Sequence, residues 1–222
     1  MNSGRHLIKI CGIGNSRDLE SAAGADMVGV VIDVPASPRN RTWEEASALF
    51  EKARGRFVSV AVLLDPPATA IERAVASGAA LVQVHGRVPT DLSAALRSRV
   101  VPSLGLPREG EVRVGQPAFS LPDMEGFPFV HLDVAREGSL GGKGEPLDRG
   151  TAHILVEDHP EVRFLLSGGL TPENVVGAIR EICPAGVDVS SGVESSPGVK
   201  SSHKVAQFIR AVRSWEERHP HA

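Results

Sequence analysis

Short runs of β-branched and other apolar residues recur along the whole chain, and segments with helical periodicity separate them. Several runs are almost continuously apolar, as expected for strands that are buried on both faces of a parallel sheet. The sequence therefore predicts eight strands, at residues 7–11 (LIKIC), 27–32 (MVGVVI), 57–64 (FVSVAVLL), 80–85 (ALVQVH), 100–106 (VVPSLGL), 128–134 (PFVHLDV), 162–166 (VRFLL) and 186–190 (GVDVS).

The segments between these strands carry helical spacing of apolar residues. The spacing is clear after Trp43, in residues 175–182 and in residues 205–215, and it is weak around Leu19. Thr171 followed by Pro172 is typical of an N-cap and first helical position, so we expect a helix to begin there. Residues 107–126 contain too many Gly and Pro for a regular helix, which predicts that the fifth helical connection is short or irregular.

Alternation of strands and helices leaves two main architectures, a closed (β/α)₈ barrel and an open doubly wound sheet. The length of 222 residues lies near the lower limit, roughly 200 residues, of the barrel. An open sheet would more often have a GxGxxG turn after its first strand, and the CGIGN turn at residues 11–15 lacks it. We therefore predict an α/β protein with a (β/α)₈ TIM barrel. No linker or composition shift divides residues 1–222, so a single domain is expected.

Composition narrows the class of protein. A hydrophobic content of 41% and a charged content of 23% are those of a soluble globular protein. A net charge of −3 argues against a nucleic-acid partner. The absence of a transmembrane-length run or a signal peptide predicts a cytoplasmic protein without a membrane partner. Cys11 and Cys183 are expected at opposite ends of the barrel, roughly 17–20 Å apart, so Cys11 should be a free thiol.

Five chemically reactive side chains follow the predicted strands. In a barrel the active site is built at the C-terminal ends of the strands. Each residue alone has a structural explanation, such as a buried small thiol or a surface charge. Together they place a thiol, an imidazole, a guanidinium and two carboxylates at one rim, so we expect one site made from Cys11, Arg39, His85, Asp133 and Asp188.

Two glycine-containing turns follow the last two strands, at residues 167–171 (SGGLT) and 190–198 (SSGVESSPG). Either turn could simply be a tight connection between a strand and the next segment. Barrels, however, often bind phosphate at these two loops, where backbone amides approach the anion closely. We therefore predict a phosphate site at Gly168, Gly169, Ser191 and Gly192.

The ordered set of motifs resembles the phosphoribosylanthranilate isomerase family of tryptophan biosynthesis. The motifs are KICG (9–12), SPR (37–39), VQVHG (82–86), LDV (132–134), GGKG (141–144), SGGLTPENV (167–175) and GVDVSSGVESSPGVK (186–200). They span nearly the whole chain, and the last two are the most specific. The CGIGN turn and the VIDVPASPR segment depart from the family's usual residues, which concerns the anthranilate side of the pocket.

The resemblance implies an Amadori rearrangement without a metal or organic cofactor, on a small phosphorylated sugar–anthranilate substrate. It implies that Asp133 is the general acid and Cys11 the general base, that Arg39 faces the anthranilate carboxylate, and that His85 and Asp188 line the pocket. A thiol base requires a pKa lowered by nearby positive charge. The GGKG stretch is a candidate lid or a solvated loop. Whether the protein is a monomer or a homodimer stays open.

Two alternatives remain at this stage. The first is the related sugar isomerase of histidine biosynthesis or a bifunctional relative, in which the family resemblance places an aspartate where this chain has Cys11. The second is a non-catalytic barrel that binds a phosphometabolite. The presence of both proposed proton-transfer residues disfavours the second alternative.

Overall fold

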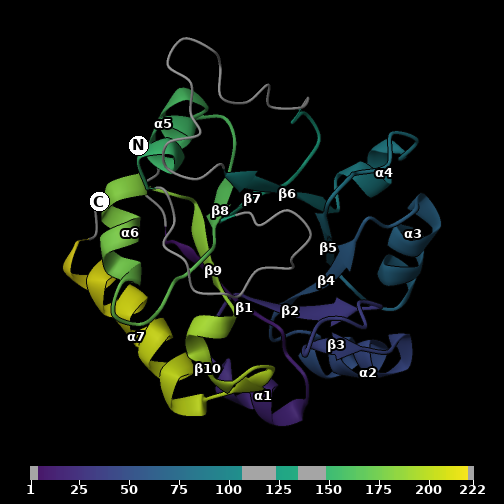
Figure 1. Cartoon of the computed structure of the whole chain (residues 1–222), viewed down its shortest axis with the longest axis horizontal. Coiled ribbons are helices and arrows are strands. Elements are labelled where there is room, and N and C mark those ends of the chain that lie inside the picture. Colours follow the sequence, from purple (N-terminus) through teal and green to yellow (C-terminus); the bar gives the residue numbers. More distant parts are fainter. Residues whose placement is uncertain (1–4, 107–123, 135–148, 220–222) are drawn as a thin grey trace.

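Parallel strands close into a barrel in the computed structural model, which describes residues 5–106, 124–134 and 149–219 (Figure 1). β1 pairs with both β2 and β9, which closes the ring β1-β2-β4-β5-β6-β7-β8-β9. The predicted TIM barrel is confirmed, and every predicted strand lies within two residues of an observed one: β1 (Leu7–Cys11), β2 (Met27–Ile32), β4 (Val58–Leu64), β5 (Leu81–His85), β6 (Val100–Leu106), β7 (Val130–Val134), β8 (Phe164–Leu166) and β9 (Gly186–Val189).

Helices surround the barrel on its outside (Figure 1). The predicted apolar faces are buried, as α2 shows by burying Ala46, Leu49, Phe50 and Ala53. The helices are α1 (Ser16–Ser21), α2 (Trp43–Ala53), α3 (Ala68–Ala76), α4 (Ala94–Arg97), α5 (Arg149–Asp158), α6 (Val175–Ile182) and α7 (Ser202–Arg218). Short elements complete the described chain: β3 (Asn40–Arg41), the 3₁₀ turn η1 (Ser191–Val193), and a hairpin of β10 (Glu194–Ser196) and β11 (Val199–Lys200). No helix in the described ranges is long and apolar enough to cross a membrane.

The predicted helix start at Thr171 is wrong. α6 begins at Val175 and its N-cap is Asn174. The carbonyl of Thr171 accepts hydrogen bonds from the amides of Asn174 (3.3 Å) and Val175 (3.1 Å), so Thr171 opens a turn that precedes the helix. Asn174 stabilises this turn by accepting from Thr171 N and donating to the carbonyl of Gly169. Most of the predicted irregular connection, residues 107–123, and the GGKG stretch lie outside the described residues.

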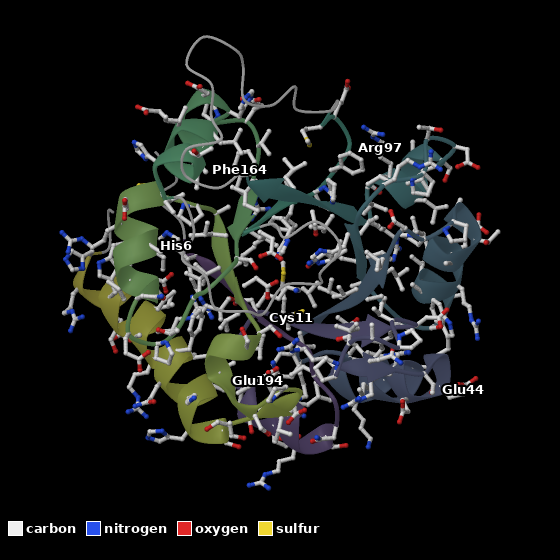
Figure 2. All side chains as sticks on the ribbon, in the orientation of Figure 1. His6, Cys11, Glu44, Arg97, Phe164 and Glu194 are labelled. Carbon is white, nitrogen blue, oxygen red and sulfur yellow. The ribbon has the colours of Figure 1, made fainter. Side chains whose placement is uncertain are left out.

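Alternate residues of each strand face opposite sides of the barrel wall. Val28, Val30 and Ile32 of β2 pack in the large core against the helices, whereas Met27 and Val31 pack in a second cluster with Cys11. Figure 2 shows Cys11 near the middle of the ring of strands. The same two-residue period directs polar side chains inward at two levels. We call Cys11, His85 and Asp133 the rim layer, and Lys9, Gln83, His131 and Asp188 the inner layer.

Candidate active site

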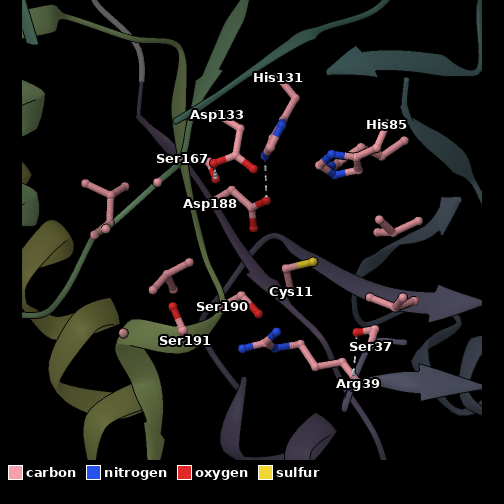
Figure 3. Close-up of a pocket in the computed structure, with 18 residues that line it drawn as sticks. Cys11, Ser37, Arg39, His85, His131, Asp133, Ser167, Asp188, Ser190 and Ser191 are labelled. Atoms are coloured by element: carbon pink, nitrogen blue, oxygen red, sulfur yellow. Dashed lines mark hydrogen bonds and ion pairs between the residues drawn. The ribbon is translucent and has the colours of Figure 1, made fainter. Parts of the chain in front are cut away.

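One pocket occupies the C-terminal mouth of the barrel. All nine residues predicted from the sequence line it: Cys11, Arg39, His85, Asp133, Gly168, Gly169, Asp188, Ser191 and Gly192. Gln83, His131, Ser167 and Ser190, which the sequence did not single out as site residues, line it as well. Figure 3 shows the polar side chains converging on this cavity from different strands.

Cys11 ends β1 and is a free thiol, with 8% of its surface exposed. Its pairing neighbour on β2 is Gly29, so no side chain from that position covers the sulfur. Burial raises the pKa of the Cys11 thiol, and Asp188 raises it further, while Lys9 and Lys200 act to lower it. The positive charge that a thiol base requires is therefore present, but burial outweighs it, and the pKa lies above its ordinary value.

Asp133 lies near the end of β7 and is partly exposed to the pocket. Its Oδ1 accepts a hydrogen bond from Ser167 Oγ (3.4 Å), at the start of the turn after β8. In the ring of strands, β8 and β9 separate β7 from β1. Asp133 and Cys11 therefore reach the cavity from different sides, and the turns that follow β8 and β9 lie between their strands.

Asp188 is the centre of the inner layer. Its Oδ2 accepts from Lys9 Nζ (2.8 Å) and from His131 Nε2 (3.0 Å). All three residues are buried, with exposed fractions of 4% for Asp188, 0% for Lys9 and 1% for His131. Burial alone would raise the pKa of Asp188, but Lys9 and His131 outweigh it and lower the pKa to about 2. Asp188 is therefore a fixed carboxylate.

His85 ends β5 and contacts the inner layer. Gln83 Nε2 donates to His85 Nε2 (2.9 Å), and the His85 ring lies edge-on to His131 with 5.6 Å between centroids. Burial, the neighbouring His131 and Lys9 lower the pKa of His85 to about 3. His85 is thus a neutral imidazole at physiological pH and can hydrogen-bond a ligand without adding charge.

Arg39 lines the pocket and is held in a buried ion pair with Glu194. Its Nε and Nη2 donate to the two carboxylate oxygens of Glu194, at 2.7 and 2.8 Å. Lys200 Nζ also donates to Glu194 (2.8 Å) and to the carbonyl of Ser190 (3.0 Å). The β10–β11 hairpin therefore fixes one edge of the guanidinium. Arg39 Nη1 donates to no acceptor among the described residues and stays available to an anion in the pocket.

The two glycine-containing turns supply backbone donors. Gly168 and Gly169 adopt φ values of 93° and 63°, which side-chain-bearing residues rarely adopt. A Cβ at Gly192 would lie 1.9 Å from the carbonyl oxygen of Leu170, so the close packing of the two turns requires glycine there. Within the described residues, the amides of Gly168, Gly169, Ser191 and Gly192 donate to no protein acceptor. These amides line the pocket, as expected for an anion site.

Comparison with known proteins assigns the family. A family model described as N-(5′-phosphoribosyl)anthranilate isomerase matches residues 8–211. An N-(5′-phosphoribosyl)anthranilate isomerase of Afipia carboxidovorans is 38% identical over 94% of this chain and 89% of its own. The chain belongs to this family. The crystal structure of the Thermotoga maritima isomerase, at 31% identity, covers 94% of this chain and 99% of its own with a TM-score of 0.75.

A further isomerase structure contains reduced 1-(o-carboxyphenylamino)-1-deoxyribulose 5-phosphate. That family member is 29% identical to this chain, with a TM-score of 0.72 over 94% of this chain and 99% of its own.

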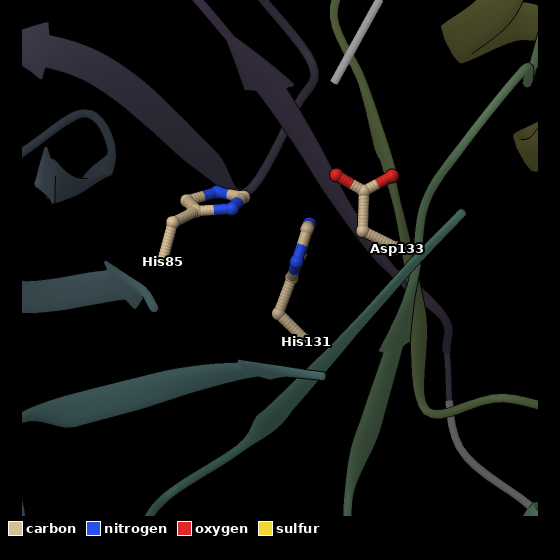
Figure 4. Close-up of side chains that lie close together, drawn as sticks. All are labelled: His85, His131 and Asp133. Carbon is tan, nitrogen blue, oxygen red and sulfur yellow. The ribbon is translucent and has the colours of Figure 1, made fainter. Parts of the chain in front are cut away.

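One group of side chains in this isomerase-family pocket has the composition of a metal site. The ligand atoms of His85, His131 and Asp133 lie within 4.8 Å of one another (Figure 4). Both ring nitrogens of His131 are already engaged, Nε2 by Asp188 and Nδ1 by the hydroxyl of Ser103 (3.2 Å). Metal binding would have to break one of these bonds. The geometry therefore favours a hydrogen-bonded cluster over a resident metal.

Sequence reasoning missed Lys9, His131 and Glu194. Lys9 and His131 lie two residues before Cys11 and Asp133 on the same strands, and the two-residue period points them into the barrel. A lysine inside LIKIC and a histidine inside VHLDV were the available signals. Glu194 lies in the turn after the last barrel strand, which was the available signal. Its pairing with Arg39 could not be predicted, because Arg39 is far away in the sequence and no local pattern indicates the contact.

Proposed function

We propose that this chain converts N-(5′-phosphoribosyl)anthranilate to 1-(2-carboxyphenylamino)-1-deoxyribulose 5-phosphate, the isomerisation of tryptophan biosynthesis, with Asp133 as general acid and Cys11 as general base. The observation that carries the assignment is a pocket that a thiol and a carboxyl group both line, together with backbone amides that have no acceptor among the described residues. Family membership over residues 8–211 supports the activity.

The first step opens the sugar ring. Protonated Asp133 donates its proton to the ring oxygen as the C1′–O4′ bond breaks, and the anthranilate nitrogen supplies the electron pair that forms the C1′=N iminium. Asp133 becomes a carboxylate. Its position near the end of β7, with Ser167 donating to Oδ1, stabilises that charge after the transfer.

The second step moves the hydrogen from C2′. The Cys11 thiolate takes the C2′ proton, the C–H electron pair forms the C1′=C2′ bond, and the iminium nitrogen becomes neutral. The resulting enolamine tautomerises by losing the proton of its C2′ hydroxyl and gaining one at C1′, which gives the ketone. A base of moderate strength is sufficient because the adjacent iminium acidifies C2′–H. The iminium charge also favours ionisation of the buried thiol.

The remaining pocket residues hold the substrate. The amides of Gly168, Gly169, Ser191 and Gly192 bind the phosphate, and Arg39 Nη1 faces the anthranilate carboxylate. Two buried acceptors, Asp188 Oδ1 and Gln83 Oε1, have no hydrogen-bond partner within the described residues. Such atoms are costly when unpaired, so sugar hydroxyl groups are their expected partners.

The test follows loss of N-(5′-phosphoribosyl)anthranilate with purified protein, a chelator and no added metal. Cys11→Ser and Asp133→Asn should each lower kcat by about 10²–10⁴-fold, the range for loss of a general acid or base. Cys183→Ser is the matched control, because Cys183 is an exposed thiol that does not line the pocket, and its rate should equal that of the wild type. Near-native turnover by either pocket variant would refute the assigned role.

A further inference from the structure

Lys9 is a fully buried cation that the two proton-transfer roles do not use. Its exposed fraction is 0%, and Nζ donates to Asp188 Oδ2 at 2.8 Å. Burying a lysine is costly, and a well-packed apolar residue often serves stability equally well. A charge at this place therefore calls for an explanation beyond packing.

The ammonium of Lys9 and the sulfur of Cys11 converge on the same point above Gly29. A Cβ added to Gly29 would lie 3.0 Å from Cys11 Sγ and 3.1 Å from Lys9 Nζ. The two atoms therefore lie within, or close to, the roughly 4–6 Å over which an opposite charge favours ionisation. Glycine at this position leaves the space between strands that both groups occupy. The cation therefore lies close to the thiol, and Lys9 is not among the residues that line the pocket.

We propose that Lys9 is a positioning residue for the isomerisation, whose buried charge stabilises the thiolate form of Cys11 while Asp188 keeps Lys9 protonated. The proposal rests on the role of Cys11 as base. Burial opposes the charge on Lys9, but Asp188 and Cys11 outweigh it, and the pKa of Lys9 lies above its ordinary value. Lys9 is therefore charged throughout the cycle and does not itself transfer a proton.

Other charged and titratable groups face the same sulfur, and their contributions differ. Lys200 of β11 also favours the thiolate, whereas Asp188 of β9 opposes it, and of these neighbours Lys9 acts most strongly. Lys200 already donates to Glu194 and to the carbonyl of Ser190, and these bonds hold it next to the Arg39–Glu194 ion pair. The remaining groups around the pocket are Arg39, His85, His131 and Asp133.

The direct test measures ionisation of Cys11 without turnover. The wild type and Lys9→Met are alkylated with iodoacetamide across pH, and the rate at each cysteine is read by mass spectrometry. The midpoint for Cys11 should rise by at least one pH unit in Lys9→Met. Cys183 serves as the internal reference, because it is exposed in both proteins and its profile should not change. An unchanged Cys11 midpoint in folded Lys9→Met would overturn the proposal.

Lys9→Met leaves Asp188 buried without its cation and could fail to fold. A second variant therefore tests the proposal without an unpaired buried charge. Lys9→Met/Asp188→Asn removes both charges. Because Lys9 affects the thiol more strongly than Asp188 does, the Cys11 midpoint in this double variant should still lie above that of the wild type, by less than in Lys9→Met. A midpoint at or below the wild-type value would overturn the proposal even if the single variant cannot be purified.

Kinetics separate this proposal from the assignment of Cys11 as base. In Lys9→Met the acid limb of the kcat/KM profile should move to higher pH, giving at least a tenfold loss at pH 7 that alkaline pH largely restores. A loss equal at every pH would mean that Lys9 is merely structural. If Cys11→Ser is fully active while the alkylation shift occurs, the base assignment fails and the electrostatic link between Lys9 and Cys11 survives.

Discussion

The rim layer and the inner layer of the barrel lie two residues apart along the same strands, yet they differ in kind. Cys11 and Asp133 of the rim layer face the cavity, and Asp133 is partly exposed. Lys9 and His131, directly below them, are buried and bonded to one carboxylate, Asp188. The barrel thus separates side chains at its mouth from a buried, hydrogen-bonded set around the fixed carboxylate of Asp188. In the proposed mechanism the inner layer sets the electrostatics of the site, and Cys11 and Asp133 of the rim layer transfer the protons.

The difference should also appear as a difference between stability and activity. Truncating one member of a buried ion pair leaves an uncompensated charge, and the cost is about 3–5 kcal/mol. When a residue that faces the cavity is truncated, water can fill the space of the removed atoms, and the loss of stability is much smaller. The inner layer should therefore be the layer in which stability and function depend on the same residues.

The largest expected effect on stability comes from replacing an aspartate of the inner layer rather than one of the rim layer. Asp188→Ala should lower the free energy of unfolding by about 3–5 kcal/mol at pH 7, because Lys9 loses its buried partner. The pKa of Asp188, lowered to about 2, means that the wild type keeps this stabilisation at neutral pH and loses it only as pH falls from about 4 toward 2. Urea unfolding measures the change.

Asp133→Ala is the matched control for that measurement. It removes a carboxylate of the same size from the rim layer and should change stability by less than about 1 kcal/mol while lowering kcat by about 10²–10⁴-fold. If the two variants proved equally stable, the distinction between a fixed inner layer and a reactive rim layer would be wrong.

The sequence predicts the rim layer better than the inner layer, and the reason is physical. Reactive residues at the ends of strands, such as Cys11 and Asp133, interrupt the apolar pattern where a barrel places its active site. Lys9 lies inside an apolar run, where a charge suggests an ordinary solvent-facing strand position unless the inside of the barrel is known to be polar. Knowing that the strand period continues inward from Cys11 would have assigned Lys9 to the site.

Contacts between segments that are distant in the sequence were the second feature that the sequence could not predict. Arg39 was predicted to face the pocket, but its buried pairing with Glu194 depends on the β10–β11 hairpin, which no local pattern predicted. Thr171 has the local signature of an N-cap, yet Asn174 hydrogen-bonds around the turn and takes that position. The strands were predictable because their apolar period is set by local burial, whereas caps and ion pairs depend on competition between particular side chains.

The two glycine-containing turns, which we propose bind the phosphate through backbone amides, should give an intermediate effect. Gly169→Ala should raise KM about tenfold, since one misplaced amide weakens a hydrogen bond to a charged ligand. The matched control is Gly55→Ala. Gly55 has a similar φ (74° against 63°) but no atom within 4 Å of an added Cβ. Both variants should lose roughly 1–2 kcal/mol of stability from left-handed strain. If KM stayed unchanged in Gly169→Ala, the SGG turn would be structural only.

The smallest effect concerns His85, where the two layers meet. The pKa of His85 is about 3 in the folded state, below the ordinary value of 6.5. Between these two pH values the unfolded state binds a proton at His85 and the folded state does not, so stability falls as pH drops from 6.5 toward 3. Between pH 6.5 and 5.5 the wild type should lose about 1 kcal/mol that His85→Gln does not lose. Urea unfolding at the two pH values measures the difference, and His203→Gln, an exposed site on α7, should behave as the wild type. A parallel loss in His85→Gln would show that His85 accepts protons in the folded state, and the rim layer would then carry a positive charge beside Cys11 in acid.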